Sequence, residues 1–267
     1  MAAALLAACE REPAVLGDAR YATLQLPAQC AADPLSGEAG AIDALQAPSG
    51  AGFSVRTPRN YDPTRAHPLL VVLAPAGHDR HRSERHAGLT TSATAAGFVV
   101  AYADHVKLTM AAFPQLGEIP AAVAERWCID ASRVSFVGHS DGGSSAAAVA
   151  FMNASTIPPA AVVVSAAGLR EDDLRQYSCA PGVDAMIVHS RADTRFPLPE
   201  FGRKPAQWWA QCNRCSPQPG PADADGCVEF TDCVAGVRVR YCEVTTMHEQ
   251  WPGLENRIVR FASEARR

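Results

Sequence analysis

The segment Gly138-His139-Ser140-Asp141-Gly142 holds a serine between two glycines at the spacing Gly-x-Ser-x-Gly. A β-type apolar run from Val134 to Val137 precedes it, and the small residues from Ser144 to Ala150 are typical of a closely packed helix. When a sharp turn joins a strand to a helix in this way, the serine has a strained backbone conformation that lifts its hydroxyl clear of the sheet. The glycines on either side are needed because larger side chains would clash with the turn. The pattern predicts a nucleophilic serine. The alternative is a glycine-rich connection with an inert serine.

A nucleophilic serine needs a base within hydrogen-bonding reach, normally a histidine that a carboxylate orients. In sheets of this type the three groups follow along the chain in the order serine, acid, histidine. Only His189 and His248 lie beyond Ser140. His248 follows every candidate acid that ends a core strand, so we predict His248 as the base.

Asp193 is the predicted acid, because it comes four residues after an apolar strand that ends at His189. This places it at the carboxyl edge of the sheet, where ligands gather in open α/β folds. Asp172 and Asp173 follow an earlier strand and are the second choice. A surface aspartate in a turn is the alternative reading of Asp193.

A tetrahedral intermediate needs two backbone N–H donors. One is expected from Asp141, directly after the serine, and the other from the loop after the strand at residues 69–73. Pro75 has no N–H, which leaves Ala76 or Gly77, and we favour Ala76. Substrate contacts are expected from three residues: Gly77, His139 and Trp251. We expect His139 to pack against the sheet and to take no part in the reaction.

The candidate site residues must be positioned by the strands and helices of the fold. Along the chain, apolar runs typical of strands alternate with patterns typical of helices. The expected strands lie at residues 69–73, 98–102, 134–137, 160–165, 185–189 and 237–243, and the expected helices at 84–96, 116–127, 144–150, 205–213 and 255–267. This alternation predicts a three-layer α/β fold with a mostly parallel central sheet. We expect a catalytic domain at residues 52–267 and a loosely structured lead-in at residues 9–51.

Composition excludes several kinds of partner. A formal net charge of −4 gives no basic face for nucleic acid, and no apolar run reaches the roughly 18 to 20 residues that cross a bilayer. The histidines at positions 78, 81 and 86 are read as solvated loop residues, and no metal or cofactor is predicted. A zinc site at Cys212, Cys215, Cys227 and Cys233 is the alternative to disulfides there.

The N-terminal residues and the cysteines indicate export. Leu6-Ala7-Ala8-Cys9 matches a bacterial lipoprotein cleavage pattern, so residues 1–8 are read as a truncated signal and Cys9 as a possible lipid anchor. Of the nine cysteines, eight remain without Cys9, an even set that could pair fully in an oxidising compartment. We expect a secreted or periplasmic protein.

Six segments carry a family resemblance: Pro68–Leu73, Gly97–Tyr102, Trp127–Asp130, Gly138–Gly143, His189–Pro197 and His248–Gly253. Through them, the chain from about Gly52 to Phe261 resembles the polyhydroxybutyrate depolymerase and feruloyl esterase group of α/β-hydrolases. The resemblance implies a secreted esterase with Ser140 as nucleophile, Asp193 as acid and His248 as base. Three places depart from the family pattern: Ala74-Pro75 replaces His-Gly, Ser190 replaces Gly, and residues 245–247 replace a glycine-rich approach to the histidine.

The expected function is therefore an exported serine hydrolase that cleaves carboxylic esters through an acyl-enzyme. Expected substrates are polyhydroxyalkanoate oligomers, hydroxycinnamoyl esters or other small esters, since no separate polymer-binding module is recognised. Two alternatives stay open. The same three residues could cleave peptides, or the chain could be an inactive hydrolase fold that serves as a surface binding protein.

Overall fold

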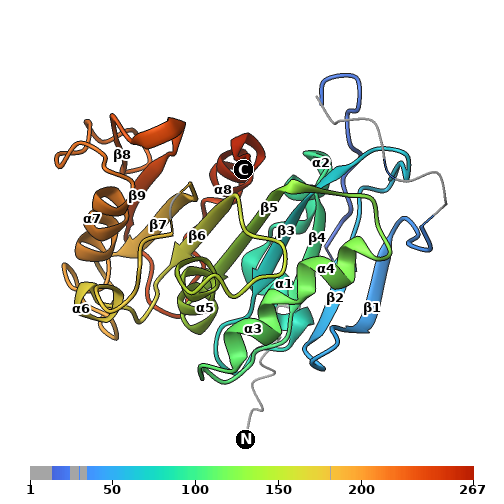
Figure 1. Ribbon diagram of the computed structural model, residues 1–267, viewed down its shortest axis with the longest axis horizontal. Coiled ribbons are helices and arrows are strands. Elements are labelled where there is room, and N and C mark those ends of the chain that lie inside the picture. The colour runs from blue at the N-terminus through green and yellow to red at the C-terminus, as the bar shows by residue number, and fades with distance from the viewer. Residues whose placement is uncertain (1–13, 25–29, 31–34, 181) are drawn as a thin grey trace, which may run out of the picture.

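A computed structural model describes residues 14–24, 30, 35–180 and 182–267 (Figure 1). The predicted signal at residues 1–8 and the predicted anchor Cys9 lie outside the described residues. Among the residues described, the strands form one nine-stranded sheet in the order β1-β2-β4-β3-β5-β6-β7-β9-β8.

Six strands of this sheet are mutually parallel, and antiparallel strands close both edges. The parallel strands are β3 (His67–Leu73), β4 (Val99–Ala103), β5 (Ile129–His139), β6 (Ala161–Ser165), β7 (Asp184–Ser190) and β9 (Val239–Val244). The edge strands are β1 (Ala41–Gln46), β2 (Gly52–Arg56) and β8 (Cys227–Phe230). The mostly parallel sheet predicted from the sequence is thus confirmed.

Helices cover both faces of the sheet, so the fold has three layers: helices, sheet and helices (Figure 1). One face carries α3 (Ala112–Gly117), α4 (Ile119–Ala124), α5 (Asp141–Phe151), α6 (Glu171–Leu174) and α7 (Arg203–Cys212). The other carries α1 (Arg80–Ala87), α2 (Thr90–Ala95) and α8 (Glu255–Glu264), and a short 3-10 turn, η1 (Val234–Gly236), lies between β8 and β9. No helix of the described residues has the length and apolar character to span a bilayer.

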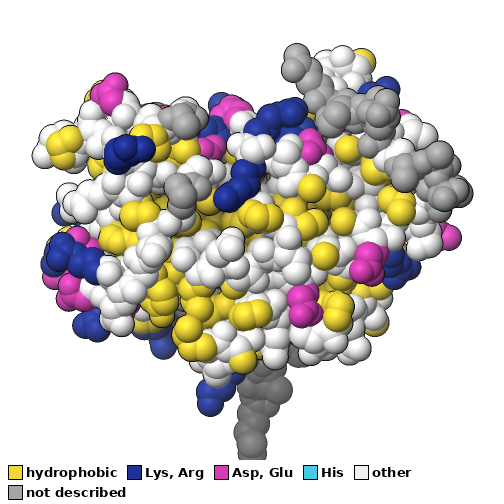
Figure 2. Space-filling view, viewed as in Figure 1, with side chains coloured by type: hydrophobic (Ala, Val, Ile, Leu, Met, Phe, Trp, Pro, Cys, Tyr) yellow, Lys and Arg dark blue, Asp and Glu magenta, His cyan; other side chains and the backbone are white. Residues whose placement is uncertain are grey.

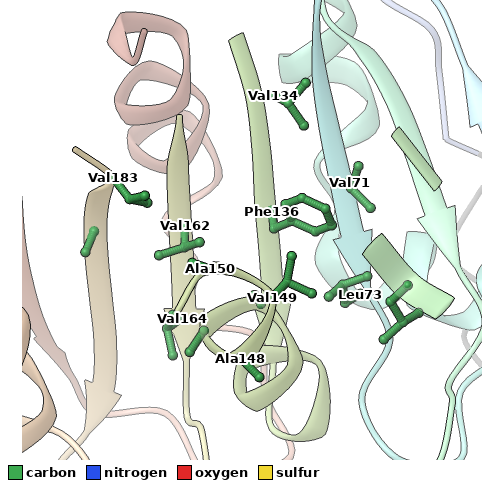
Figure 3. Close-up of a cluster of buried hydrophobic side chains, with 14 of the residues drawn as sticks. Val71, Leu73, Val134, Phe136, Ala148, Val149, Ala150, Val162, Val164 and Val183 are labelled. Atoms are coloured by element: carbon green, nitrogen blue, oxygen red, sulfur yellow. The ribbon is translucent and has the colours of Figure 1, made fainter. Parts of the chain in front are cut away.

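Side chains of the central strands alternate between the two cores, as the two-residue period of a strand requires. Val134 and Phe136 of β5 point to the α5 side, whereas Val137 points to the α1, α2 and α8 side. Figure 3 shows Phe136 of β5 close to Val149 of α5. The small residues of α5 allow this helix to lie close to the sheet, and its residues from Gly142 to Phe151 are all buried.

The face that carries α3, α4 and α5 also exposes apolar side chains. Figure 2 shows hydrophobic side chains gathered across the middle of this face. A hollow with about 650 Å³ of empty volume lies beside α5, and Leu108, Phe113 and Tyr177 are among its lining residues. Leu108 and Tyr177 are among the large hydrophobic residues that the fold leaves exposed.

Eight cysteines form four disulfides: Cys30–Cys128, Cys179–Cys212, Cys215–Cys233 and Cys227–Cys242. The zinc alternative is therefore wrong, since each of its four cysteines has a disulfide partner. Cys227–Cys242 joins β8 to β9, and two further bridges tie down the segment before β8. Four disulfides are consistent with an extracellular or periplasmic protein.

Two parts of the fold differ from the sequence prediction. The expected lead-in contains β1, which pairs with β2, so the sheet begins at Ala41 rather than near Gly52. The single helix expected at residues 116–127 is two short helices that meet at Glu118, where Pro120 occupies the first turn of α4. Proline has no N–H for a helical bond, which favours a new helix start at this point.

Candidate active site

Ser140 lies on a sharp turn between the end of β5 and the start of α5. Its φ of 55° and ψ of −120° are unusual for a residue with a side chain. A Cβ atom on Gly138 would lie 2.1 Å from the carbonyl oxygen of Gly142, and one on Gly142 would lie 2.1 Å from that of Leu73. Both positions of the Gly-x-Ser-x-Gly pattern therefore need glycine, because Gly138 packs on the backbone at the start of α5 and Gly142 packs on the backbone of β3.

The structure brings the predicted serine, histidine and acid together at the carboxyl edge of the sheet. Ser140 Oγ lies 3.0 Å from His248 Nε2, and His248 Nδ1 lies 2.7 Å from Asp193 Oδ2. A carboxylate only accepts, so the proton sits on Nδ1 and Nε2 is free to accept the serine proton. The arrangement can therefore generate an activated hydroxyl.

Asp193 is held as an ionised acceptor. Its second oxygen, Oδ1, accepts from the backbone N–H groups of Arg195 and Phe196, both at 2.9 Å. Burial raises the pKa of the Asp193 carboxyl, but the hydrogen bonds from His248 and from the Phe196 N–H outweigh burial, and the pKa lies below its ordinary value. Asp193 thus stays charged beside the imidazole.

The second-choice acids lie elsewhere. Asp173 accepts from the backbone N–H of Arg170 at the start of α6, and Asp172 is on the same short helix. Within the described part of the chain, neither is hydrogen-bonded to His248, because Asp193 occupies that position.

The pocket above the serine has about 520 Å³ of empty volume. It is lined by Pro75, Ala76, His78, His86, His139, Ser140, Arg195, His248 and Glu249. Ala76, the expected second oxyanion donor, shares this pocket with Ser140. Gly77 comes next along the chain with a left-handed φ of 74°, and the Trp251 ring packs on those of His86 and His139. Of the three expected substrate contacts, His139 is the one that lines the pocket.

His81 at the start of α1 is exposed, as we expected, but His78 and His86 are not the solvated residues that we expected. His78 and His86 are half-buried and pack edge to face with ring centroids 5.2 Å apart. Burial lowers the pKa of His78. The sequence contained one signal for this placement, namely that His78 follows a core strand at the carboxyl edge of the sheet.

Other pocket residues missed in the sequence sit beside the predicted ones. Arg195 and Glu249 are one or two residues from Asp193 and His248, and their side chains form an exposed ion pair of 3.5 Å. No group of three or more His, Cys, Asp or Glu side chains is arranged to hold a metal ion in the part of the chain that the structure describes.

Comparison with known proteins gives a match in structure and none in sequence. No protein-family model matches the chain, and no curated protein matches it. An acetyl xylan esterase from Aspergillus awamori superposes with a TM-score of 0.60 at 14% identity, over 85% of this chain and 99% of the esterase. An S-formylglutathione hydrolase from Staphylococcus aureus superposes with a TM-score of 0.58 at 12% identity, over 84% and 98%.

A truncated carbohydrate esterase from gut microbiota superposes with a TM-score of 0.53 at 14% identity, over 88% of this chain and 98% of that esterase. At such low identity these likenesses concern the fold alone. The chain therefore has the three-layer α/β-hydrolase fold, with a mostly parallel central sheet.

Proposed function

We propose that this chain is a serine hydrolase that cleaves carboxylic esters through an acyl-enzyme intermediate. The observation that carries the proposal is the hydrogen-bonded series Ser140 Oγ, His248 and Asp193, with distances of 3.0 and 2.7 Å, on a strained turn. Nucleophile, base and orienting acid are the three roles that such a series fills.

In this mechanism His248 Nε2 takes the Ser140 proton while Oγ attacks the ester carbonyl carbon. The resulting oxyanion accepts hydrogen bonds from the backbone N–H groups of Asp141 and Ala76. His248 then gives its proton to the leaving alcohol, and the C–O bond breaks to leave the acyl group on Ser140. A water molecule, deprotonated by His248, releases the acid and restores the hydroxyl.

Small or oligomeric esters are the proposed substrates, including polyhydroxyalkanoate oligomers and hydroxycinnamoyl esters. The pocket over Ser140 is open and is lined by imidazoles and by the Arg195–Glu249 pair, which suits a substrate with polar groups beside the ester. The fold neighbours that are named acetyl xylan esterase, carbohydrate esterase and S-formylglutathione hydrolase support ester chemistry. The disulfides support action outside the reducing cytoplasm.

The test is the variant Ser140→Ala with a short p-nitrophenyl ester and a fluorophosphonate probe. We expect loss of both turnover and labelling, while the matched variant Ser263→Ala keeps both. Ser263 lies on α8, and its side-chain hydroxyl donates to the Arg260 carbonyl of its own helix. Undiminished turnover in Ser140→Ala would reject the proposal. A wild type that neither labels nor turns over would favour the binding-protein alternative, and cleavage of peptides without esters would favour the peptidase alternative.

A further inference from the structure

We propose that His139 and Ser190 are positioning residues, which set the place of His248 by holding the backbone carbonyls of the loop that carries it. This inference rests on the proposed function, because it assigns a role toward the base of that same site. The loop runs over residues 245–254, from the end of β9 to the start of α8. Neither side chain is hydrogen-bonded to Ser140 Oγ, so both act through the loop.

His139 reaches the loop from the serine turn. Its Nε2 lies 2.6 Å from the carbonyl oxygen of His248, and its Nδ1 lies 3.0 Å from Ser165 Oγ. A carbonyl only accepts, so Nε2 carries a proton and donates it to the loop. Burial lowers the pKa of His139 to about 4, so the ring is neutral and its Nδ1 accepts from the Ser165 hydroxyl. Every polar atom of this buried ring is thereby satisfied.

Ser190 reaches the same loop from the end of β7. Its hydroxyl donates to the carbonyl of Thr246 and accepts from the backbone N–H of Ala192 at 3.0 Å. Ser190 is 4% exposed, so this bond is shielded from water. The loop is therefore held at two carbonyls that are two residues apart, and two fixed points restrict rotation of the backbone that carries the His248 ring.

The His139 contact also connects the base to the nucleophile. The backbone carbonyl of Ser165 accepts from the Ser140 N–H at 2.9 Å, while the Ser165 hydroxyl holds the His139 ring. Ser165, at the end of β6, thus holds both the backbone of Ser140 and the ring of His139, which in turn holds the backbone of His248. The distance of 3.0 Å between Ser140 Oγ and His248 Nε2 depends on this short series of bonds.

Substituting His139 by glutamine or asparagine distinguishes a hydrogen-bonding role of this residue from a packing role. A glutamine nitrogen can take the place of Nε2, so His139→Gln keeps the donor to the His248 carbonyl. An asparagine reaches only the Nδ1 position, so His139→Asn keeps a partner for Ser165 and loses the bond to the loop. The two variants differ by one methylene and carry the same functional group.

The experiment measures kcat and KM for a p-nitrophenyl ester, and the rate of inactivation by a fluorophosphonate, at pH 8. For His139→Asn and for Ser190→Ala we expect kcat and the inactivation rate to fall about 10- to 100-fold, the range that a displacement of about 1 Å costs. We expect KM to change less than about threefold, because the polar atoms of both side chains are already bonded to protein groups and not free to bind substrate. His139→Gln should recover most of the lost kcat.

His67→Asn is the matched control for the loss of a buried histidine. His67 is also fully buried, and its ring nitrogens lie 2.7 and 3.1 Å from backbone carbonyls, but it sits at the start of β3 near the opposite edge of the sheet. We expect it to lower the free energy of unfolding and to leave kcat of the folded enzyme unchanged.

Several outcomes would overturn the positioning role. Unchanged kcat in both His139→Asn and Ser190→Ala would do so, as would a glutamine variant as slow as the asparagine variant. If His139→Asn does not fold, Ser190→Ala decides alone, and wild-type kcat in that variant rejects the proposal. Failure of the wild type itself to label or to cleave esters would instead reject the proposed function.

Discussion

Acid should destabilise this protein partly through His139, because folding keeps that imidazole neutral. Burial lowers the pKa of His139 from the ordinary value of 6.5 to about 4, although the hydrogen bond to the His248 carbonyl opposes this shift. The perturbation is a change of pH from 7.5 to 4, applied to the wild type and to His139→Gln. Glutamine keeps the bond to the loop and does not titrate.

The sign and size follow from proton linkage. Between pH 6.5 and pH 4 the unfolded chain binds a proton at residue 139 that the folded protein does not bind, so the free energy of unfolding falls as the pH is lowered. The contribution is fully present above about pH 6.5 and changes no further well below pH 4. A shift of one unit is worth 1.36 kcal/mol, which gives a loss of about 3 kcal/mol at pH 4.

Urea unfolding followed by tryptophan fluorescence, with the disulfides intact, measures this loss at the two pH values. Burial also lowers the pKa of His67 and His189, and Asp193 has a lowered pKa, so the wild type loses stability through these groups as well. They are present in both proteins and cancel in the comparison. We expect the wild type to lose about 3 kcal/mol more than His139→Gln. Equal losses in the two proteins would refute the assignment of a neutral, buried His139.

Three further substitutions test the site and the core. Asp193→Asn should lower kcat about 10⁴-fold at nearly unchanged KM in ester assays, since His248 would no longer be held with its proton on Nδ1; a loss under tenfold would contradict this role. Gly142→Ala should lower both Tm and kcat, because its Cβ would lie 2.1 Å from the Leu73 carbonyl oxygen, and a wild-type melting curve would argue against the tight turn. Phe136→Ala should cost about 3 to 5 kcal/mol in urea unfolding, as the ring is fully buried between β5 and α5, and a cost below 1 kcal/mol would be inconsistent with that packing.

The parallel strands and the serine turn could be predicted because their signals are local. Apolar runs such as Leu69–Leu73 identify strands buried on both faces, and Gly138 and Gly142 mark a turn that excludes side chains. The edge strands β1 and β8 escaped prediction. β1 is largely exposed, β8 has only four residues, and neither sequence contains a long apolar run.

Chain order and residue type alone were enough to propose Ser140, Asp193 and His248 as a set, since the order of strands decides which loops reach the carboxyl edge. The pairing of eight cysteines, the packing of His78 and His86 around the pocket, and the two bonds that hold the His248 loop were decided by tertiary structure. His139 and His248 are 109 residues apart in the chain, and their contact depends on how β5 and β9 are placed in the sheet. A sequence pattern reports on neighbours within a few residues, whereas such a bond exists only after the whole sheet has assembled.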